Sequence, residues 1–254
     1  MFRVIRITIL LLVLFVVSVS SLLTRARSTD WDNSLWVKIY PINADGSEMS
    51  QRYIDSLTID AFTGIEAFMA RETGKRGVTI DAPVRMELGP QVGEQPPALP
   101  ASPGIPQVMW WSLRLRWWAA GVTDDRIAPD IRLFVRYHAP RADLPLENSV
   151  GMQKGMVGVV NAYAGRGHTS TNNVIMAHEL LHTLGATDKY DPASGLPVYP
   201  AGYGEPEREP LYPQRYAEIM GGRIALSPSD ATIPESLRHA VIGPETAHEI
   251  NLAP

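Results

Sequence analysis

Residues 173–190 place two histidines and a glutamate at spacings that suit a metal centre. His178 and His182 lie four residues apart, so on a helix both imidazoles project from one face and can bind one zinc ion. Glu179 follows the first histidine, where its carboxylate can take a proton from a water molecule that the zinc activates. These three residues predict a zinc-dependent hydrolase in which Glu179 is the catalytic base.

Two further residues extend this pattern. Gly185 can adopt a positive φ and end the helix, so that the chain turns and brings Asp188 back toward the metal. An aspartate oxygen is a competent third zinc ligand, and two histidines with one carboxylate leave a fourth position for water. We therefore expect His178, His182 and Asp188 to bind Zn²⁺. The alternative is a polar helix end with solvated histidines, which the combined spacing disfavours.

The same segment also predicts how the helix is held in place. Four apolar residues recur at helical spacing on the face away from the histidines, which indicates a core-facing stripe. Asn172 or Thr171 is a suitable N-cap. The stripe consists of Val174, Ala177, Leu181 and Leu184.

The pattern His178-Glu179-x-x-His182-x-x-Gly185-x-x-Asp188 resembles the long zinc signature of the metzincin metalloproteases. Most of that group have histidine in the last position, and the aspartate variant with a tyrosine two residues later is similar to the snapalysin family. The resemblance is strong over residues 178–190 and only architectural elsewhere. It implies an α+β fold with a twisted mixed sheet, an active-site helix and a small irregular C-terminal subdomain.

Metzincins also have a Met-turn, a tight turn whose methionine lies beneath the metal. The resemblance nominates Met220, because the two glycines that follow it suit a sharp turn. The alternative is an ordinary loop methionine. Some metzincins place a tyrosine ligand two residues after this methionine, but Gly222 stands there, which argues against a tyrosine switch of that kind.

Other polar residues near the motif are weaker candidates. Tyr190 is a candidate transition-state stabiliser, with simple packing as the alternative. His168 could touch substrate or replace Asp188 as a ligand, but a surface histidine is the favoured interpretation. Three glutamates in the loop 191–215 could bind calcium, but they lack EF-hand spacing, so a solvated loop is expected. They are Glu205, Glu207 and Glu209.

The remaining chain predicts the elements that position this motif. Alternating apolar residues indicate strands at 35–40, 84–88, 130–137 and 156–163, and helical spacing indicates a helix at 51–71. This order is typical of an α/β or α+β layer architecture. The strand 156–163 is nearest in sequence to the motif. We nominate it as the edge strand on which an extended substrate would pair, as in the resembling family.

Residues 108–120 contain four of the six tryptophans. We expect a helix ended by Gly121, although part of the segment also alternates like a strand. Core packing under arginine stems is the favoured interpretation. A membrane-interface or substrate-binding aromatic patch is the alternative.

The first 24 residues have the layout of a targeting segment. Arg3 and Arg6 precede an uncharged apolar run at 7–24, which predicts an uncleaved signal-anchor. A cleaved signal peptide, with small residues before the cleavage site, is the alternative. We therefore expect an extracytoplasmic, membrane-anchored protein, or a secreted one if the segment is removed. Residues 25–254 would form one catalytic domain, with an N-terminal subdomain to about residue 185 and a C-terminal subdomain at about 186–254.

Composition narrows the function classes. The chain of 254 residues is 45% hydrophobic and 20% charged, which is typical of a globular protein. A net charge of −4 gives no nucleic-acid footprint, and the absence of cysteine excludes disulfides and a thiol nucleophile. We expect a zinc-dependent endopeptidase acting on a polypeptide substrate. The alternatives are a non-catalytic zinc-containing binding protein and a zinc hydrolase of a non-peptide amide.

Overall fold

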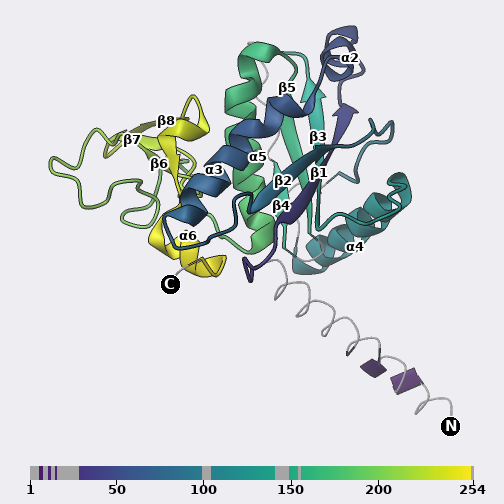
Figure 1. Ribbon diagram of the computed structural model, residues 1–254, viewed down its shortest axis with the longest axis horizontal. Coiled ribbons are helices and arrows are strands. Elements are labelled where there is room, and N and C mark those ends of the chain that lie inside the picture. Colours follow the sequence, from purple (N-terminus) through teal and green to yellow (C-terminus); the bar gives the residue numbers. More distant parts are fainter. Residues whose placement is uncertain are drawn as a thin grey trace.

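The computed structural model describes residues 6–7, 11–12, 15, 29–98, 104–140, 149–153 and 156–252. These residues form a mixed α+β fold around a five-stranded sheet, which confirms the expected fold class at this level (Figure 1). The strands are β1 (Leu35–Asn43), β2 (Val84–Leu88), β3 (Ile131–His138), β4 (Val150–Met152) and β5 (Val157–Tyr163).

The sheet has the strand order β2-β1-β3-β5-β4. Neighbouring strands are parallel except for β4, which pairs antiparallel to β5. The order corrects one prediction: the strand at 156–163 is not an edge strand, because β5 lies between β3 and β4. The edge beside β5 is β4, a three-residue strand too short to produce an alternating pattern in the sequence.

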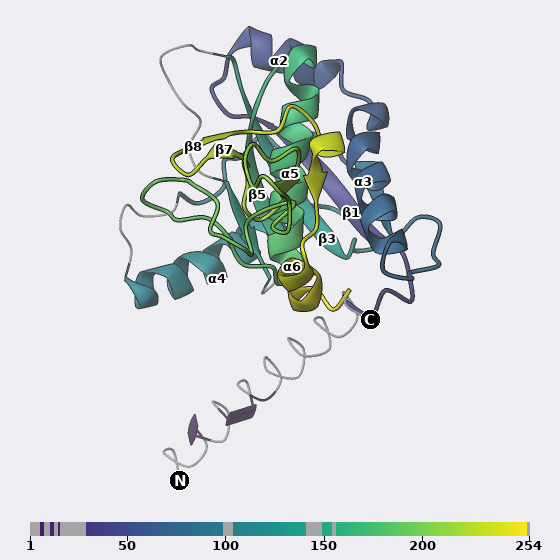
Figure 2. The same ribbon diagram turned by 90° about the vertical axis from the view of Figure 1, so that its left-hand side faces the viewer.

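Helices cover both faces of the sheet (Figures 1 and 2). The helices α3 (Thr63–Gly74) and α5 (Thr169–Leu184) pack on one face, and α4 (Ile105–Val122) packs on the other. Side chains alternate accordingly along β3. Leu133 and Val135 belong to the larger core under α3 and α5, while Phe134 belongs to the smaller core under α4.

The single helix expected at 51–71 is wrong. The chain instead forms α2 (Glu48–Asp55), a 3₁₀ turn (Ile59–Phe62) and then α3. At the break, the Ser56 hydroxyl donates to the carbonyl oxygen of Tyr53 at 2.8 Å. A serine that bonds the preceding turn in this way competes with helix propagation, and the β-branched Thr58 favours the extended backbone found there.

The tryptophan-rich segment forms α4, as predicted, but it continues past Gly121. Trp111 and Leu115 are buried against the sheet, which agrees with core packing for one face. Trp110 and Trp117 lie on the other face and are 62% and 81% exposed. The core-packing interpretation therefore holds for the buried face of α4 but not for the face that carries Trp110 and Trp117.

The chain after α5 consists of short elements and long loops, shown at the left of Figure 1. Its apolar residues, including Ile219, Leu237 and Ile242, join the same core as α3 and α5. The regular elements are β6 (Ala217–Glu218), β7 (Ile224–Ser227), β8 (Asp230–Thr232), a 3₁₀ turn (Leu237–His239), β9 (Ala240–Val241) and α6 (Pro244–Glu249).

The expected signal-anchor is corrected by the structure. No helix within the described part of the chain is long and apolar enough to cross a membrane. The predicted transmembrane segment at 7–24, the membrane-anchored location and the membrane contact through those residues are therefore not supported. Most of residues 1–24 lie outside the described residues, and so does the predicted domain boundary after residue 24.

Candidate metal centre

The candidate site is built on α5, which begins at Thr169, earlier than expected. The predicted N-cap residue Asn172 has a different role. Its side-chain amide donates to the carbonyl oxygen of Tyr163 at 2.9 Å and accepts from the Tyr163 N–H at 3.2 Å. The Asn172 side chain thus makes the two backbone hydrogen bonds that a neighbouring strand would make at the end of β5. These bonds fix the start of α5 against the sheet.

The predicted apolar stripe of α5 is buried throughout. Val174, Ala177, Leu181 and Leu184 belong to the main core, so this face holds the helix down. The helix ends at Gly185, where φ is 108°. A residue with a side chain rarely adopts this left-handed conformation, so glycine allows the chain to reverse toward His178 and His182.

Three predicted ligand atoms converge in the structure: Nε2 of His178, Nε2 of His182 and Oδ1 of Asp188. Each pair of these atoms is 3.1 Å apart. A tetrahedral zinc ion about 2.0–2.1 Å from each ligand atom would separate the ligands by about 3.3–3.4 Å. The three side chains therefore fit zinc. Within the described residues they are the one group of three His, Cys, Asp or Glu ligand atoms gathered in this way.

The orientation of both rings supports the same assignment. Nδ1 of His178 donates to the carbonyl oxygen of Ile219 at 2.9 Å, and Nδ1 of His182 donates to that of Ala186 at 2.8 Å. A carbonyl can only accept, so each Nδ1 carries the proton and each Nε2 is free for a metal. Backbone acceptors of this kind are the usual outer partners of zinc-binding histidines.

Electrostatics at the cluster favour a bound positive charge. Burial raises the pKa of the Asp188 carboxyl, but its contacts with His178 and His182 outweigh burial and hold that pKa well below its usual range. Burial lowers the pKa of the His178 ring, and the carboxylates of Asp188 and Glu179 raise it overall. Two ring nitrogens and a carboxylate oxygen this close together are stable only with a proton or a cation among them.

Glu179 is 5% exposed, and its Oε2 atom has no hydrogen-bond partner among the described residues. Burial raises the pKa of this carboxyl, while His178, His182 and the backbone N–H of Gly151 lower it. A buried carboxylate oxygen without a hydrogen-bond partner destabilises the fold. In native proteins such an atom is often explained by a catalytic role or by a bound water or ion. Its place next to the first histidine matches the role predicted for a catalytic base.

The edge strand β4 lies directly against the ligand face of α5. A Cβ atom added at Gly151 would lie 2.6 Å from Cβ of His182 and 3.1 Å from Oε2 of Glu179, and it would overlap the carbonyl oxygen of Glu179. Only glycine therefore allows this approach. Gly151 could not be predicted from the sequence, since an isolated glycine in a short segment has no local pattern.

Met220 is fully buried and lies in the turn that approaches the site. The preceding carbonyl, that of Ile219, is the partner of His178, and the carbonyl oxygen of Met220 accepts from the Lys189 N–H at 2.9 Å. The turn that follows Asp188 and the turn at Met220 are thus joined. The Met-turn prediction remains a prediction, since it rests on the family resemblance.

A buried carboxylate, Glu218, shapes this turn. It accepts from the N–H groups of Met220, Gly221 and Gly243 at 2.7–3.0 Å and from the Thr246 hydroxyl at 2.7 Å. Burial raises its pKa, and these four donors act in the opposite direction. Glu218 could not be predicted from the sequence either, because two of its partners lie more than twenty residues away.

The loop that carries Asp188 is tied down on its other side. Nζ of the buried Lys189 donates to the Glu249 carboxylate at 2.8 Å and to the carbonyl oxygen of Thr187 at 2.9 Å. Glu249 also accepts from the Thr187 N–H and hydroxyl. The helix α6 therefore fixes the residues on both sides of Asp188.

Tyr190 lies next to the cluster, with its ring centroid 6.4 Å from that of His178. Burial raises the pKa of its hydroxyl, and the Asp188 and Glu179 carboxylates raise it further, so the hydroxyl stays protonated at neutral pH. A protonated phenol can donate a hydrogen bond, which is what the proposed transition-state role requires.

The weaker candidates are not brought to the site. His168 packs against the ring of Tyr163 and is not part of the ligand cluster. Glu205 pairs with Arg215, and Glu207 and Glu209 are exposed. Within the described chain no cluster of acidic ligands forms among these glutamates.

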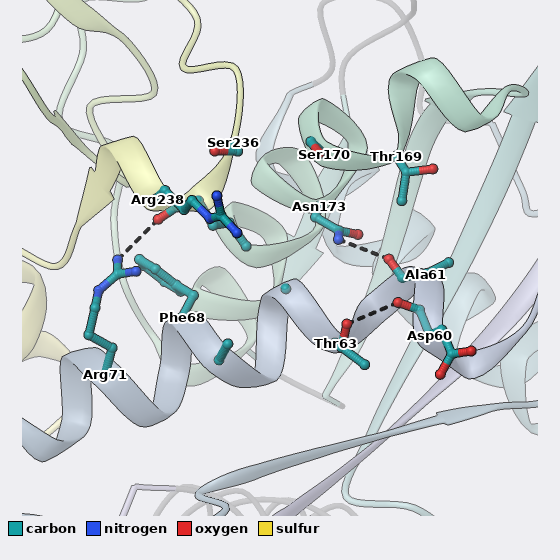
Figure 3. A pocket seen from close by; sticks show the side chains of 13 residues that line it. Asp60, Ala61, Thr63, Phe68, Arg71, Thr169, Ser170, Asn173, Ser236 and Arg238 are labelled. Carbon is teal, nitrogen blue, oxygen red and sulfur yellow. Dashed lines mark hydrogen bonds between the residues drawn. The ribbon is translucent and has the colours of Figure 1, made fainter.

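Two cavities border α5. The larger, of about 610 Å³, lies at the start of α5 between that helix, α3 and the 3₁₀ turn at 237–239 (Figure 3). There Asn173 donates to the carbonyl oxygen of Ala61 at 2.9 Å. The smaller, of about 390 Å³, includes His178 and Tyr190 in its wall. Of the three converging side chains, His178 lines the smaller cavity and none lines the larger one.

Comparison with known proteins assigns no family. No protein-family model and no curated protein matches the chain. Among solved structures, it is similar to a chain in "Structure of a chaperone-substrate complex", with 14% identity and a TM-score of 0.41. That match covers 86% of this chain and 34% of the other, so the chain spans about a third of its length. A likeness at this level assigns neither fold family nor function.

Proposed function

We propose that this protein is a zinc-dependent endopeptidase of the metzincin type. The observation that carries the proposal is the convergence of His178, His182 and Asp188 beside the buried, unpartnered carboxylate oxygen of Glu179. His178, His182 and Asp188 would hold the ion. When bound, zinc supplies Lewis-acid chemistry, polarising a carbonyl oxygen and lowering the pKa of water toward about 7.

In this proposal each side chain has a defined task. Glu179 takes a proton from the attacking water and delivers it to the leaving amine. Burial, which raises the pKa of Glu179, makes the carboxylate a stronger base for taking the proton from water in the first step. The Tyr190 hydroxyl donates a hydrogen bond to the oxygen on which negative charge develops.

The position of β4 supports a polypeptide as substrate. Its pairing partner β5 lies on one side, and the ligand face of α5 lies next to Gly151. An extended peptide that added to this edge would receive main-chain hydrogen bonds and bring a peptide bond close to Glu179. We assign this role to β4 in place of the strand at 156–163.

The test compares the full-length chain with its Glu179→Gln variant, measuring zinc content and cleavage of casein or gelatin. We expect both proteins to bind one equivalent of zinc, and only the parent to cleave. Glutamine keeps the size of the side chain but cannot accept the proton. Zinc binding without cleavage of any peptide by the parent would favour a non-catalytic binding protein or hydrolysis of a non-peptide amide. A folded protein that binds no zinc would contradict the proposal.

A further inference from the structure

The cavity beside the metal cluster has three walls of different origin. Val174 and Ile175 contribute from α5, Ile219 from the segment before Met220, and Ile233 from the segment after β8. His178 and Tyr190 also line the cavity, and His178 is one of the three candidate zinc ligands. At about 390 Å³ the cavity is within the usual range for a ligand pocket, and it is large enough for one amino-acid side chain.

Arg223 is the one residue with a permanent charge in this wall. It follows Gly222, directly after the turn at Met220, and its guanidinium lies near Gly195 on the opposite loop. Its side chain is half-buried and makes no hydrogen bond or ion pair with any described residue. Arg71 and Arg215, by contrast, donate to backbone carbonyls or to a carboxylate.

An unpaired guanidinium in a mainly apolar pocket indicates a ligand of particular chemistry. Its five N–H donors form a planar fork that matches a carboxylate with two parallel hydrogen bonds. The surrounding isoleucine and valine side chains suit an aliphatic stem. Taken together, the walls and the cation match a short methylene chain that ends in a carboxylate.

We propose that Arg223 is a specificity-determining residue that binds an acidic side chain of the substrate adjacent to the scissile bond. This inference rests on the proposed peptidase function and names a substrate class for it. The cavity reaches His178, so a side chain bound there belongs to a residue close to the peptide bond that is cleaved. Polypeptides with glutamate or aspartate at that position would be preferred over those with the neutral amides.

The test uses a peptide series in which glutamate or glutamine occupies each of three positions on either side of the cleaved bond. At one position we expect the full-length protein to prefer glutamate by roughly 10- to 100-fold in kcat/KM, as charged hydrogen bonds contribute. Arg223→Gln should remove the preference, so that the glutamate and glutamine peptides are cleaved with kcat/KM values within about twofold of each other. Arg85→Gln is the matched control, because Arg85 is exposed on β2 at the opposite edge of the sheet.

A second measurement separates this inference from the peptidase proposal. The same peptides are bound to the zinc-loaded Glu179→Gln protein, with and without Arg223→Gln, and affinity is read by fluorescence anisotropy. Glutamate-selective binding that depends on Arg223 supports the pocket, even if the parent protein cleaves nothing. Cleavage without any glutamate preference overturns the role of Arg223 and leaves the peptidase proposal standing. Absence of both binding and cleavage overturns both.

Discussion

Nδ1 of His178 donates to the backbone carbonyl oxygen of Ile219 at 2.9 Å, joining the ligand helix to a turn 41 residues further along the chain. This contact sets the ring so that Nε2 faces Asp188 and His182. The geometry of the candidate metal centre therefore depends on whatever holds the Ile219 carbonyl in place. Glu218, the neighbouring residue, does so through its four hydrogen bonds.

Replacing Glu218 should damage both the fold and the metal centre. Glu218→Ala would leave the buried N–H groups of Met220 and Gly243 and the Thr246 hydroxyl unpaired, so we expect a loss of about 3 kcal/mol or more in the free energy of unfolding. Zinc affinity should fall roughly 10- to 100-fold, as for other outer-partner changes. Urea unfolding and competition with a chromophoric chelator measure the two effects. Glu207→Ala, at an exposed position, is the control and should change neither.

Gly151→Ala tests the contact between the edge strand and the ligand helix. The added methyl group would meet the backbone of Glu179 and Cβ of His182, so either β4 or α5 must move. We expect a loss of about 1–3 kcal/mol in stability, and a fall in kcat/KM larger than this loss explains at temperatures where the variant is folded. Gly93→Ala has open space around it and serves as the control. Equal activity of the two variants would contradict the placement of β4 beside the catalytic base.

The parts that the sequence predicted well are local. The convergence of His178, His182 and Asp188, the helix stop at Gly185 and the strand at 84–88 each depend on residues close together in the chain, so periodicity and turn chemistry were sufficient. The three converging residues lie within eleven positions of the chain, and their binding of zinc stays a prediction.

The parts that the sequence could not predict depend on distant contacts. β4 is recognisable only from its pairing with β5 and its contact with α5, and three residues carry no periodicity. From the sequence alone Glu218 would be expected at the surface, because its partners Gly243 and Thr246 lie far along the chain. The sequence predicted the tryptophan-rich helix but not which tryptophans it buries. One helix can bury Trp111 and still leave Trp117 exposed.

The choice between Asp188 and His168 as third ligand can be decided directly. Asp188→Ala should lower zinc affinity by at least about 100-fold, because it removes one of three converging ligand atoms. His168→Ala should leave affinity unchanged, because that ring packs on Tyr163 away from the cluster. Chelator competition at pH 7 measures both. The reverse result would show that His168 is the ligand and that the arrangement around Asp188 is not the zinc-bound one.

Glu249 provides a prediction about pH. Burial raises the pKa of this carboxyl, but Lys189 and Thr187 outweigh burial and hold the pKa below its usual value. The carboxylate therefore stabilises the fold at pH values above its unfolded pKa of about 4.3, and this contribution is lost as pH falls through the lowered folded-state pKa.

Glu249→Gln should cost roughly 1 kcal/mol at pH 7, because the ion pair is partly exposed. The difference from the parent should become smaller as pH falls from 7 to 3. Urea unfolding at both pH values measures it, with the exposed Glu245→Gln on the same helix as the control. A difference that stays constant between pH 7 and pH 3 would show that the charge of Glu249 does not hold the Asp188 loop.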